Sequence, residues 1–160
     1  YFVNEDQLIA DPVRPFIKRV RPAFVLLQTG FGLGVTQGAI DSMIEVEDAL
    51  GHVNQFLHDR PSELQPELDR VKAKIHELSS DIFSGSPEVL VDVLDVRAQV
   101  SELSLRATQS ALLHQGARGY LMSSPVQRRI REAHFVAIVT PAIKHLRWEM
   151  SKLMKADLAA

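Results

Sequence analysis

Apolar residues recur every three or four positions through most of this chain, with polar residues between them. This spacing places the apolar side chains on one face of an α-helix, and that face must pack against another element. The pattern therefore predicts an all-α protein. It is clearest in two stretches, at Val71, Ile75, Leu78 and Ile82, and at Val93, Val96, Val100, Leu103, Ala107 and Ala111.

The eight prolines divide the pattern into separate helices, because proline is tolerated in the first turn of a helix and excluded from its interior. Three long antiparallel helices closed by a shorter final pair make an antiparallel four-helix bundle. We expect helices over residues of about 22–57, 63–83, 87–114, 125–139 and 141–155.

Four short motifs predict where helices begin. Ser86-Pro87 and Thr140-Pro141 each place a hydroxyl at the N-cap and proline at the first helical position. Ser62 to Gln65 and Ser124 to Gln127 match the capping box, in which the cap hydroxyl and the amide side chain satisfy free backbone donors.

The first 20 residues differ from the rest, because their short apolar pieces are broken by Asn4, Pro12 and Pro15 and are too short for a helix of their own. We expect residues 1–20 to be the tail of a preceding domain or a linker. The helical bundle would then span residues 21–158.

The composition is that of an ordinary globular domain, with 160 residues, 46% hydrophobic, a net charge of −2 and no cysteine. Disulfides and thiolate zinc sites are excluded, and a pI near 6.3 argues against a nucleic-acid partner. We find no apolar run near the roughly 20 residues that a membrane span needs, and no cationic leader. We therefore predict no membrane partner and a cytoplasmic location.

Charge is unevenly distributed along the chain. Residues 41–105 hold 14 acids and 5 bases, whereas residues 116–160 hold 8 bases and 3 acids. We favour complementary faces that meet within or between subunits over the alternative, an anion site made by the basic segment alone.

The residues usual in metal and nucleophilic sites are missing or scattered. No Glu-x-x-His motif occurs, so a di-iron carboxylate site is not expected, and we predict no metal. There is neither cysteine nor a Gly-x-Ser-x-Gly elbow to supply a nucleophile.

Two glycine-rich segments are candidates for ligand contact. The glycines of residues 30–38 have neither dinucleotide nor P-loop spacing, and we expect them to allow close approach of a neighbouring helix. In Gly116 to Tyr120, two glycines flank an arginine at a helix end. A helix cap and turn is the favoured interpretation, and contact with an anionic or planar ligand is the alternative.

These residues carry a resemblance to a known family. Gly116 to Tyr120, followed by Ser124 to Ala133, resembles the Gly-Gly-x-Gly-Tyr and Pro-Val-x-Arg-x-x-Arg-Asp-Ala run of the acyl-CoA dehydrogenase family, in its C-terminal helical domain. Gly34 to Asp41 is similar to a stretch on the first helix of that domain. The matches span residues 22–153.

The resemblance implies one FAD per subunit, assembly as a homodimer or homotetramer, and acyl-CoA or another small molecule as substrate. It also implies that residues 1–20 end a β-domain and that most of the enzyme lies upstream. The chain would then be a fragment, inactive by itself.

Two candidate cofactor contacts come from the middle of the chain. Phe56 falls where the family's turn reaches the flavin of a neighbouring subunit, and Gln65 lies near its ribose-contacting glutamine. Val53 and Leu57 stand where the family has arginine and glycine in that turn.

The other candidate cofactor contacts lie in the glycine run. Gly116 and Ala117 occupy the Gly-Gly that approaches the partner's FAD, and Gly119 belongs to the same run. Leu113 stands where the family has a glutamine.

The resemblance supplies no catalytic residue. The base that removes the α-proton in many family dehydrogenases falls nine residues after Arg131, at Thr140, and the alternative base position of some members falls at Phe24. Neither is acidic, and a threonine hydroxyl is far from the pKa near 7 that suits a general base.

The leading hypothesis is therefore the C-terminal domain of an acyl-CoA dehydrogenase-like, FAD-dependent oxidoreductase acting on the CH-CH group of acyl thioesters. A domain of a flavin-dependent monooxygenase of the same fold is one alternative, because such relatives lack the base. A non-catalytic helical oligomerisation module is the other.

Overall fold

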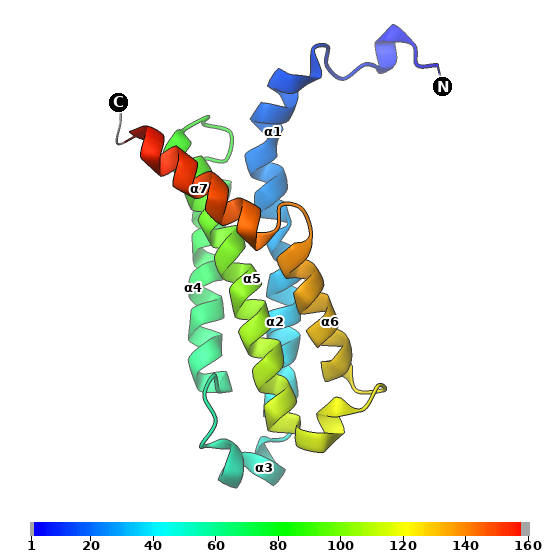
Figure 1. Ribbon diagram of the computed structural model, residues 1–160, viewed down its shortest axis with the longest axis vertical. Helices are drawn as coiled ribbons and strands as arrows, with labels where there is room; N and C mark the ends of the chain where they lie inside the picture. Colours follow the sequence, from blue (N-terminus) through cyan, green and yellow to red (C-terminus); the bar gives the residue numbers. More distant parts are fainter. Residues whose placement is uncertain (1, 158–160) are drawn as a thin grey trace.

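The computed structural model describes residues 2–157, and over these residues it contains helices and no strand, which confirms the all-α prediction. Two are short 3-10 helices and seven are α-helices (Figure 1). In chain order the elements are η1 (Glu5–Gln7), α1 (Val13–Leu27), α2 (Thr29–Ile44), α3 (Glu47–Asn54), α4 (Pro61–Ser79), α5 (Pro87–Gln115), η2 (Gly116–Tyr120), α6 (Pro125–Ile138) and α7 (Ile143–Asp157).

Helices α2, α4, α5 and α6 run side by side with alternating direction, which confirms the predicted antiparallel four-helix bundle (Figure 1). Helix α5 is central, because it packs against α1, α2, α4, α6 and α7. Helix α7 crosses the bundle near one end, and α3 closes the other end.

The predicted apolar stripe of α5 forms the centre of the core, and all six of its positions are buried. Its first half packs with the end of α1, the end of α4 and α7, and its second half packs with α2, the start of α4 and α6. The predicted stripe of residues 71–82 is buried at Val71 and Leu78 of α4 and partly buried at Ile75; Ile82 is also buried, but it lies beyond α4, which ends at Ser79 and not near residue 83 as expected.

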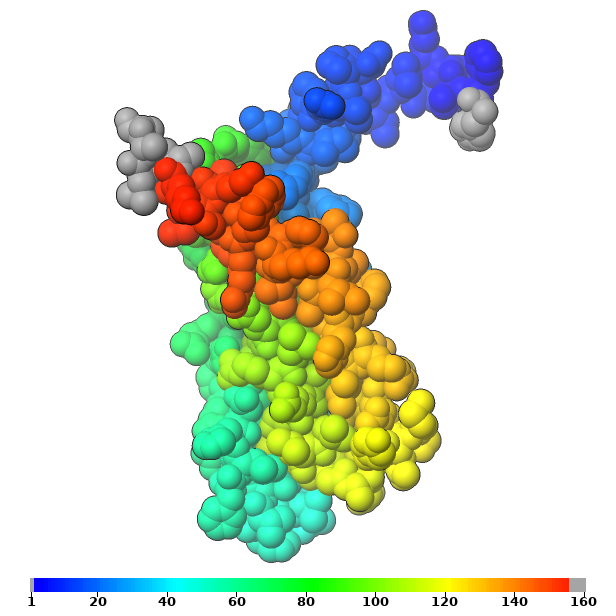
Figure 2. Space-filling model, in the orientation of Figure 1, coloured from blue at the N-terminus to red at the C-terminus, as the bar shows by residue number. Residues whose placement is uncertain are grey.

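The expected start of the first helix at Pro22 is wrong, because α1 begins at Val13. Pro15 lies in the first turn, where its missing N–H has no acceptor in the helix, and Pro22 is accommodated inside the helix. The first half of α1 projects from the body of the molecule (Figure 2). Residues 13–20 are therefore helical, while the division into two domains stays a prediction, with its limits at residues 1 and 158 outside the described residues.

The single helix expected over residues 22–57 is divided into three. A turn at Gln28 separates α1 from α2, although the two run nearly in line (Figure 1). Val46, with φ −107° and ψ 1°, separates α2 from α3, which ends at Asn54. The apolar pattern did not reveal these interruptions because it continues across them.

Two predicted helix starts are confirmed. The Ser86 hydroxyl accepts a hydrogen bond from the Val89 N–H at 3.2 Å and caps α5. The Ser124 hydroxyl accepts from the Val126 N–H at 3.2 Å and caps α6.

Two predicted starts are wrong. Helix α4 begins before Ser62, with Arg60 at the N-cap, because the Glu63 carboxylate reaches back to accept from the Arg60 N–H at 2.9 Å. Helix α7 begins at Ile143, because the carbonyl of Thr140 accepts from a glutamine side chain instead of opening a helix.

Gly32 confirms the expected close approach of helices, since a Cβ there would collide with Val100 of α5. A Cβ on Gly38 would lie 2.6 Å from Arg129 Nε of α6. Gly30 and Gly34 have open space instead, so the interpretation does not extend to them.

One ion pair among the described residues joins the acidic and the basic segment, that of Arg147 of α7 with Glu102 of α5. In a second pair, outside this pattern, the Arg21 guanidinium of α1 donates twice to the Glu149 carboxylate of α7 at 2.5 Å. The bond to Glu149 raises the pKa of Arg21. Part of the charge complementarity thus acts within the chain.

The segment Val13–Ile44 is, among the described residues, one helical stretch long and apolar enough to cross a membrane. This corrects the expectation that no apolar run reaches that length. In its apolar window, 44% of the residues are buried inside the bundle.

Candidate functional site

One end of the bundle, here called the α3–α5 end, brings together residues 54–59 and 110–120. The Asn54 side chain is buried, and its Nδ2 donates to the carbonyl of His114 at 3.3 Å. The Ser110 hydroxyl donates to the carbonyl of Asp59 at 2.9 Å. These bonds fix the turn after α3 against the last turns of α5.

Phe56, a predicted cofactor contact, lies in that turn with 80% of its surface exposed. Leu113, at the family's glutamine position, lines the same cavity of about 310 Å³. The structure thus brings these two positions together. The other residues around the cavity are Leu57, His58, Asp59, Arg106, Gln109 and Ser110.

The glycine run lies at the same end. Gly116 caps α5 with φ 61° and ψ −145°, which confirms the predicted cap and requires glycine. Gly116 and Ala117 are exposed, and nothing lies within 4 Å of where a Cβ on Gly116 would be. Gly119 differs: it is buried, and a Cβ there would lie 2.8 Å from Gln115 Cβ. Its small size therefore serves packing within the chain.

Gln65 is directed toward α2 and is not among the residues around the Phe56 cavity. Its Oε1 accepts from Gln37 Nε2 at 3.0 Å, and its own Nε2 donates to Asp69 Oδ1 at 3.0 Å. The Gln65 side chain is thus occupied within the chain, apart from the other candidate contacts.

Arg106 is a cavity residue that the sequence did not reveal. Its guanidinium pairs with Asp59 at 2.5 Å and with Glu67 at 2.9 Å. These bonds, that to Asp59 foremost, raise the pKa of Arg106. Because its partners come from the α3–α4 turn and from α4, no spacing within α5 could have indicated it. Its charge is already neutralised locally, so it does not replace the family arginine that is missing at Val53.

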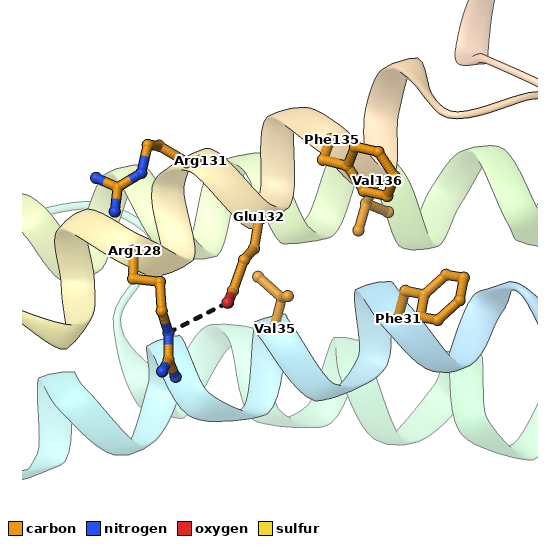
Figure 3. Close-up of a pocket in the computed structure, with 7 residues that line it drawn as sticks. All are labelled: Phe31, Val35, Arg128, Arg131, Glu132, Phe135 and Val136. Carbon is orange, nitrogen blue, oxygen red and sulfur yellow. Dashed lines mark ion pairs between the residues drawn. The ribbon is translucent and has the colours of Figure 1, made fainter.

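A second region, here called the α2–α6 groove, is a largely apolar cavity of about 380 Å³ between these helices (Figure 3). Aromatic and aliphatic side chains lie toward one end, and two arginines lie toward the other. Arg128 Nε pairs with Glu132 Oε1 at 3.1 Å. The groove is lined by Phe31, Val35, Arg128, Arg131, Glu132, Phe135 and Val136.

The two base positions of the family lie close together beyond this groove. Thr140 is exposed in the loop after α6, and its carbonyl accepts from Gln28 Nε2 at 3.1 Å. The Gln28 N–H donates to the carbonyl of Phe24, which is 58% exposed on α1. Gln28 therefore bridges the two positions, and neither carries an acid. Glu132 is the carboxylate of the groove lining, two helical turns before Thr140.

The two base positions lie far from the α3–α5 end along the bundle, because α6 runs between them. Helix α6, which has 14 residues and rises about 1.5 Å per residue, puts roughly 21 Å between its start and its end. Within residues 2–157, no group of three or more His, Asp or Glu side chains could hold a metal ion.

Comparisons with known proteins agree with this geometry. The family model of the acyl-CoA dehydrogenase C-terminal domain matches residues 72–140, which include the glycine run and Thr140 but not Phe56 or Gln65. No curated protein matches the chain.

A solved structure, that of glutaryl-coenzyme A dehydrogenase in complex with glutaryl-CoA, matches with a TM-score of 0.55 at 15% sequence identity. The match covers 84% of this chain and 36% of that one, so this chain spans about a third of its length. Likeness at this identity shows a shared fold. Residues 72–140 thus match the C-terminal domain of acyl-CoA dehydrogenases, and the chain shares the helical fold of a member of that family, in agreement with the resemblance found in the sequence.

Proposed function

We propose that this chain is the C-terminal domain of an acyl-CoA dehydrogenase-like, FAD-dependent oxidoreductase, in which it contributes flavin contacts and an oligomer interface. The observation that carries the proposal is the α3–α5 end. There an exposed aromatic side chain and an open glycine cap lie at one end of a bundle whose family match includes that cap.

The residues of this end fit part of FAD. Phe56 offers an aromatic face, and Gly116 and Ala117 leave room for close approach by a planar group. This end offers less positive charge for the phosphates of FAD, because Val53 stands where the family has arginine and Arg106 is already paired with Asp59 and Glu67. When bound, FAD supplies the redox chemistry, and the protein positions it. Gln65, through its bonds to Gln37 and Asp69, and Gly119, through its close packing, would serve mainly the structure of the bundle.

Exposed apolar side chains support an oligomer through the same end. Large apolar side chains that gather on an exposed surface mark interaction sites. A homodimer or homotetramer would cover it, and a partner subunit there would explain why so much apolar surface lies outside the core. The exposed side chains are Phe56, Leu113, Tyr120, Leu121 and Met122.

The reaction we propose is oxidation at the CH-CH group of an acyl thioester such as acyl-CoA, in a protein longer than this chain. The α-proton would have to be taken up by a carboxylate base outside the two aligned positions, since these are Thr140 and Phe24. We place residues 21–158 after a β-domain in a longer, cytoplasmic enzyme. The 160 residues alone would be inactive.

The missing acid favours one second candidate, a flavin-dependent monooxygenase of the same fold, which needs no α-proton base. An oligomerisation module without catalysis would account for the missing acid equally well.

The test is to purify the protein expressed from the complete reading frame and record its absorbance. Flavin absorbance that is bleached by acyl-CoA without oxygen would support the dehydrogenase. Bound flavin that acyl-CoA leaves oxidised would favour the monooxygenase. No flavin, even with FAD added, would leave the oligomerisation module.

A further inference from the structure

Arg97 of α5 is a charged side chain in the centre of the core, with no exposed surface. Its Nη1 donates to the Ser101 hydroxyl and its Nη2 donates to the carbonyl of Val136 at 2.9 Å. Nε has no partner, and none of the ion pairs among the described residues includes Arg97. Burial lowers the pKa of this guanidinium, because the charged form loses its hydration. A cation buried without a carboxylate is costly, and apolar residues usually pack there at least as well.

The partner of Arg97 on α6 explains what this cation does. Val136 lies in the last turn of α6, where carbonyls lack partners within the helix. The Val136 carbonyl would pair with the Thr140 N–H in a longer helix, but α6 ends at Ile138 with Val139 extended, and the residue before Pro141 is disfavoured in the helical conformation. The guanidinium therefore caps the end of α6 from another helix, and its charge meets the negative end of the helix dipole.

Gln28 acts on the same segment from the junction of α1 and α2. It is 8% exposed, and its Nε2 donates to the carbonyl of Thr140 at 3.1 Å. Two buried side chains, Arg97 of α5 and Gln28 between α1 and α2, thus donate to the carbonyls of residues 136 and 140. Between them lies the point where the chain leaves α6.

We propose that Arg97 and Gln28 are positioning residues that fix the end of α6 and the loop to α7, and so set where Thr140 lies beside the α2–α6 groove. The importance of position 140 rests on the proposed function. The anchoring itself depends only on contacts within this chain.

The shape of the side chain matters as well as its charge. The Ser101 hydroxyl accepts from Arg97 and donates to the Arg97 carbonyl at 2.9 Å, which orients the guanidinium plane. A planar fork can serve Ser101 and Val136 at once, whereas a lysine ammonium is a single compact group. Arg97→Lys should therefore restore only part of the anchoring.

The test is amide hydrogen exchange of the whole 160-residue chain carrying Arg97→Met. Methionine has similar length and removes the buried charge, so the bundle should fold. We expect amides of residues 137–139 and 145–146 to exchange at least about tenfold faster, the factor that loss of a hydrogen bond from a charged donor brings. Exchange in α4 should stay unchanged.

Two further variants control this result. Gln28→Leu should speed exchange in the same segment, because it removes the bond to Thr140 and keeps the volume. Ser101→Ala should have a smaller effect than Arg97→Met, because the bond from Arg97 to Val136 remains. If Arg97→Met does not fold, Gln28→Leu and Arg97→Lys decide the matter.

The proposal is overturned if exchange rises equally in α4 and α6, which indicates a general packing role, or if the loop is unchanged in the variants that fold. The proposed function fails by a different measurement, the absence of flavin from the longer protein. A failure there would leave a local exchange effect intact, so the two failures are distinguishable.

Discussion

The α3–α5 end and the α2–α6 groove are built in opposite ways. At the α3–α5 end, polar bonds from Asn54 and Ser110 hold the backbone while apolar side chains such as Phe56 point outward. At the end of α6 beyond the groove, the polar groups lie inside, with Arg97 buried, and charged residues such as Arg131 rim an apolar lining. The first arrangement leaves apolar side chains exposed, and in the second buried polar side chains donate to carbonyls at the end of α6 and in the loop after it.

The comparison also separates binding from catalysis. Phe56, Gly116 and Ala117, three of the predicted cofactor contacts, lie at the first region. The positions at which the family has its base lie at the second, and both lack an acid. In the proposed enzyme, contact with the cofactor and removal of the proton would therefore be tasks of different parts of this domain.

The largest effect on stability should come from a larger side chain at Gly32, where α2 packs closely against α5. Gly32→Val should lower the free energy of unfolding by about 3 kcal/mol, because its Cβ alone collides with Val100. Gly34→Val is the matched control, with open space around it and an expected change within about 0.5 kcal/mol. Denaturant titration of both variants measures the difference, and equal effects would show that helix propensity alone matters.

A smaller loss should follow at the other region. Asn54→Ala removes a buried hydrogen bond that joins α3 to α5, so it should cost about 1–2 kcal/mol. We also expect faster proteolysis within residues 55–60, since the turn loses its anchor. Gln109→Ala, at an exposed position on α5, is the control and should leave both stability and cleavage as they are. Unchanged cleavage in Asn54→Ala would contradict the anchoring of this end.

The ion pairs of Arg106 should contribute less to the free energy of unfolding than the Asn54 bond does. Arg106→Gln should cost about 0.5–1 kcal/mol, because the ion pairs with Asp59 and Glu67 are near the surface. The cost should shrink in high salt, where such pairs are screened. Thermal unfolding at two salt concentrations measures it, and a cost that is independent of salt would point to packing of the side-chain stem.

The smallest effect should be a pH dependence at the start of α4. The bond from the Arg60 N–H lowers the pKa of Glu63, so this stabilisation is present above the ordinary glutamate pKa. It is lost as the pH falls through the lower pKa of the folded state. Glu63→Gln keeps a side chain that can accept the bond from the Arg60 N–H but does not titrate. The difference in free energy of unfolding between this variant and the unaltered chain should therefore become smaller at acidic pH. A constant difference would exclude this contribution.

Much of the fold could be predicted because it follows from local rules. The apolar stripe of α5, the caps at Ser86 and Ser124 and the glycine cap at Gly116 each depend on residues close in sequence. The start of α1 could not be predicted in this way. Proline rules alone place a break at Pro15 and Pro22, whereas the helix tolerates both.

The site was less predictable because it depends on contacts between helices. The pairing of Arg106 and the α2–α6 groove both arise only when separate helices pack. Arg97 did leave a signal, since it lies four residues after Val93 and three before Val100 on the apolar face of α5. A charge within an apolar stripe indicates a buried polar contact.

The central claim is that the α3–α5 end contacts FAD, and flavin retention tests it most directly. In the protein expressed from the complete reading frame, Phe56→Ala should lower the ratio of bound flavin to protein. Phe31→Ala, at the α2–α6 groove and also exposed, should leave that ratio unchanged. Flavin retained fully by Phe56→Ala, or lost equally from both variants, would contradict the assignment of cofactor contact to the α3–α5 end.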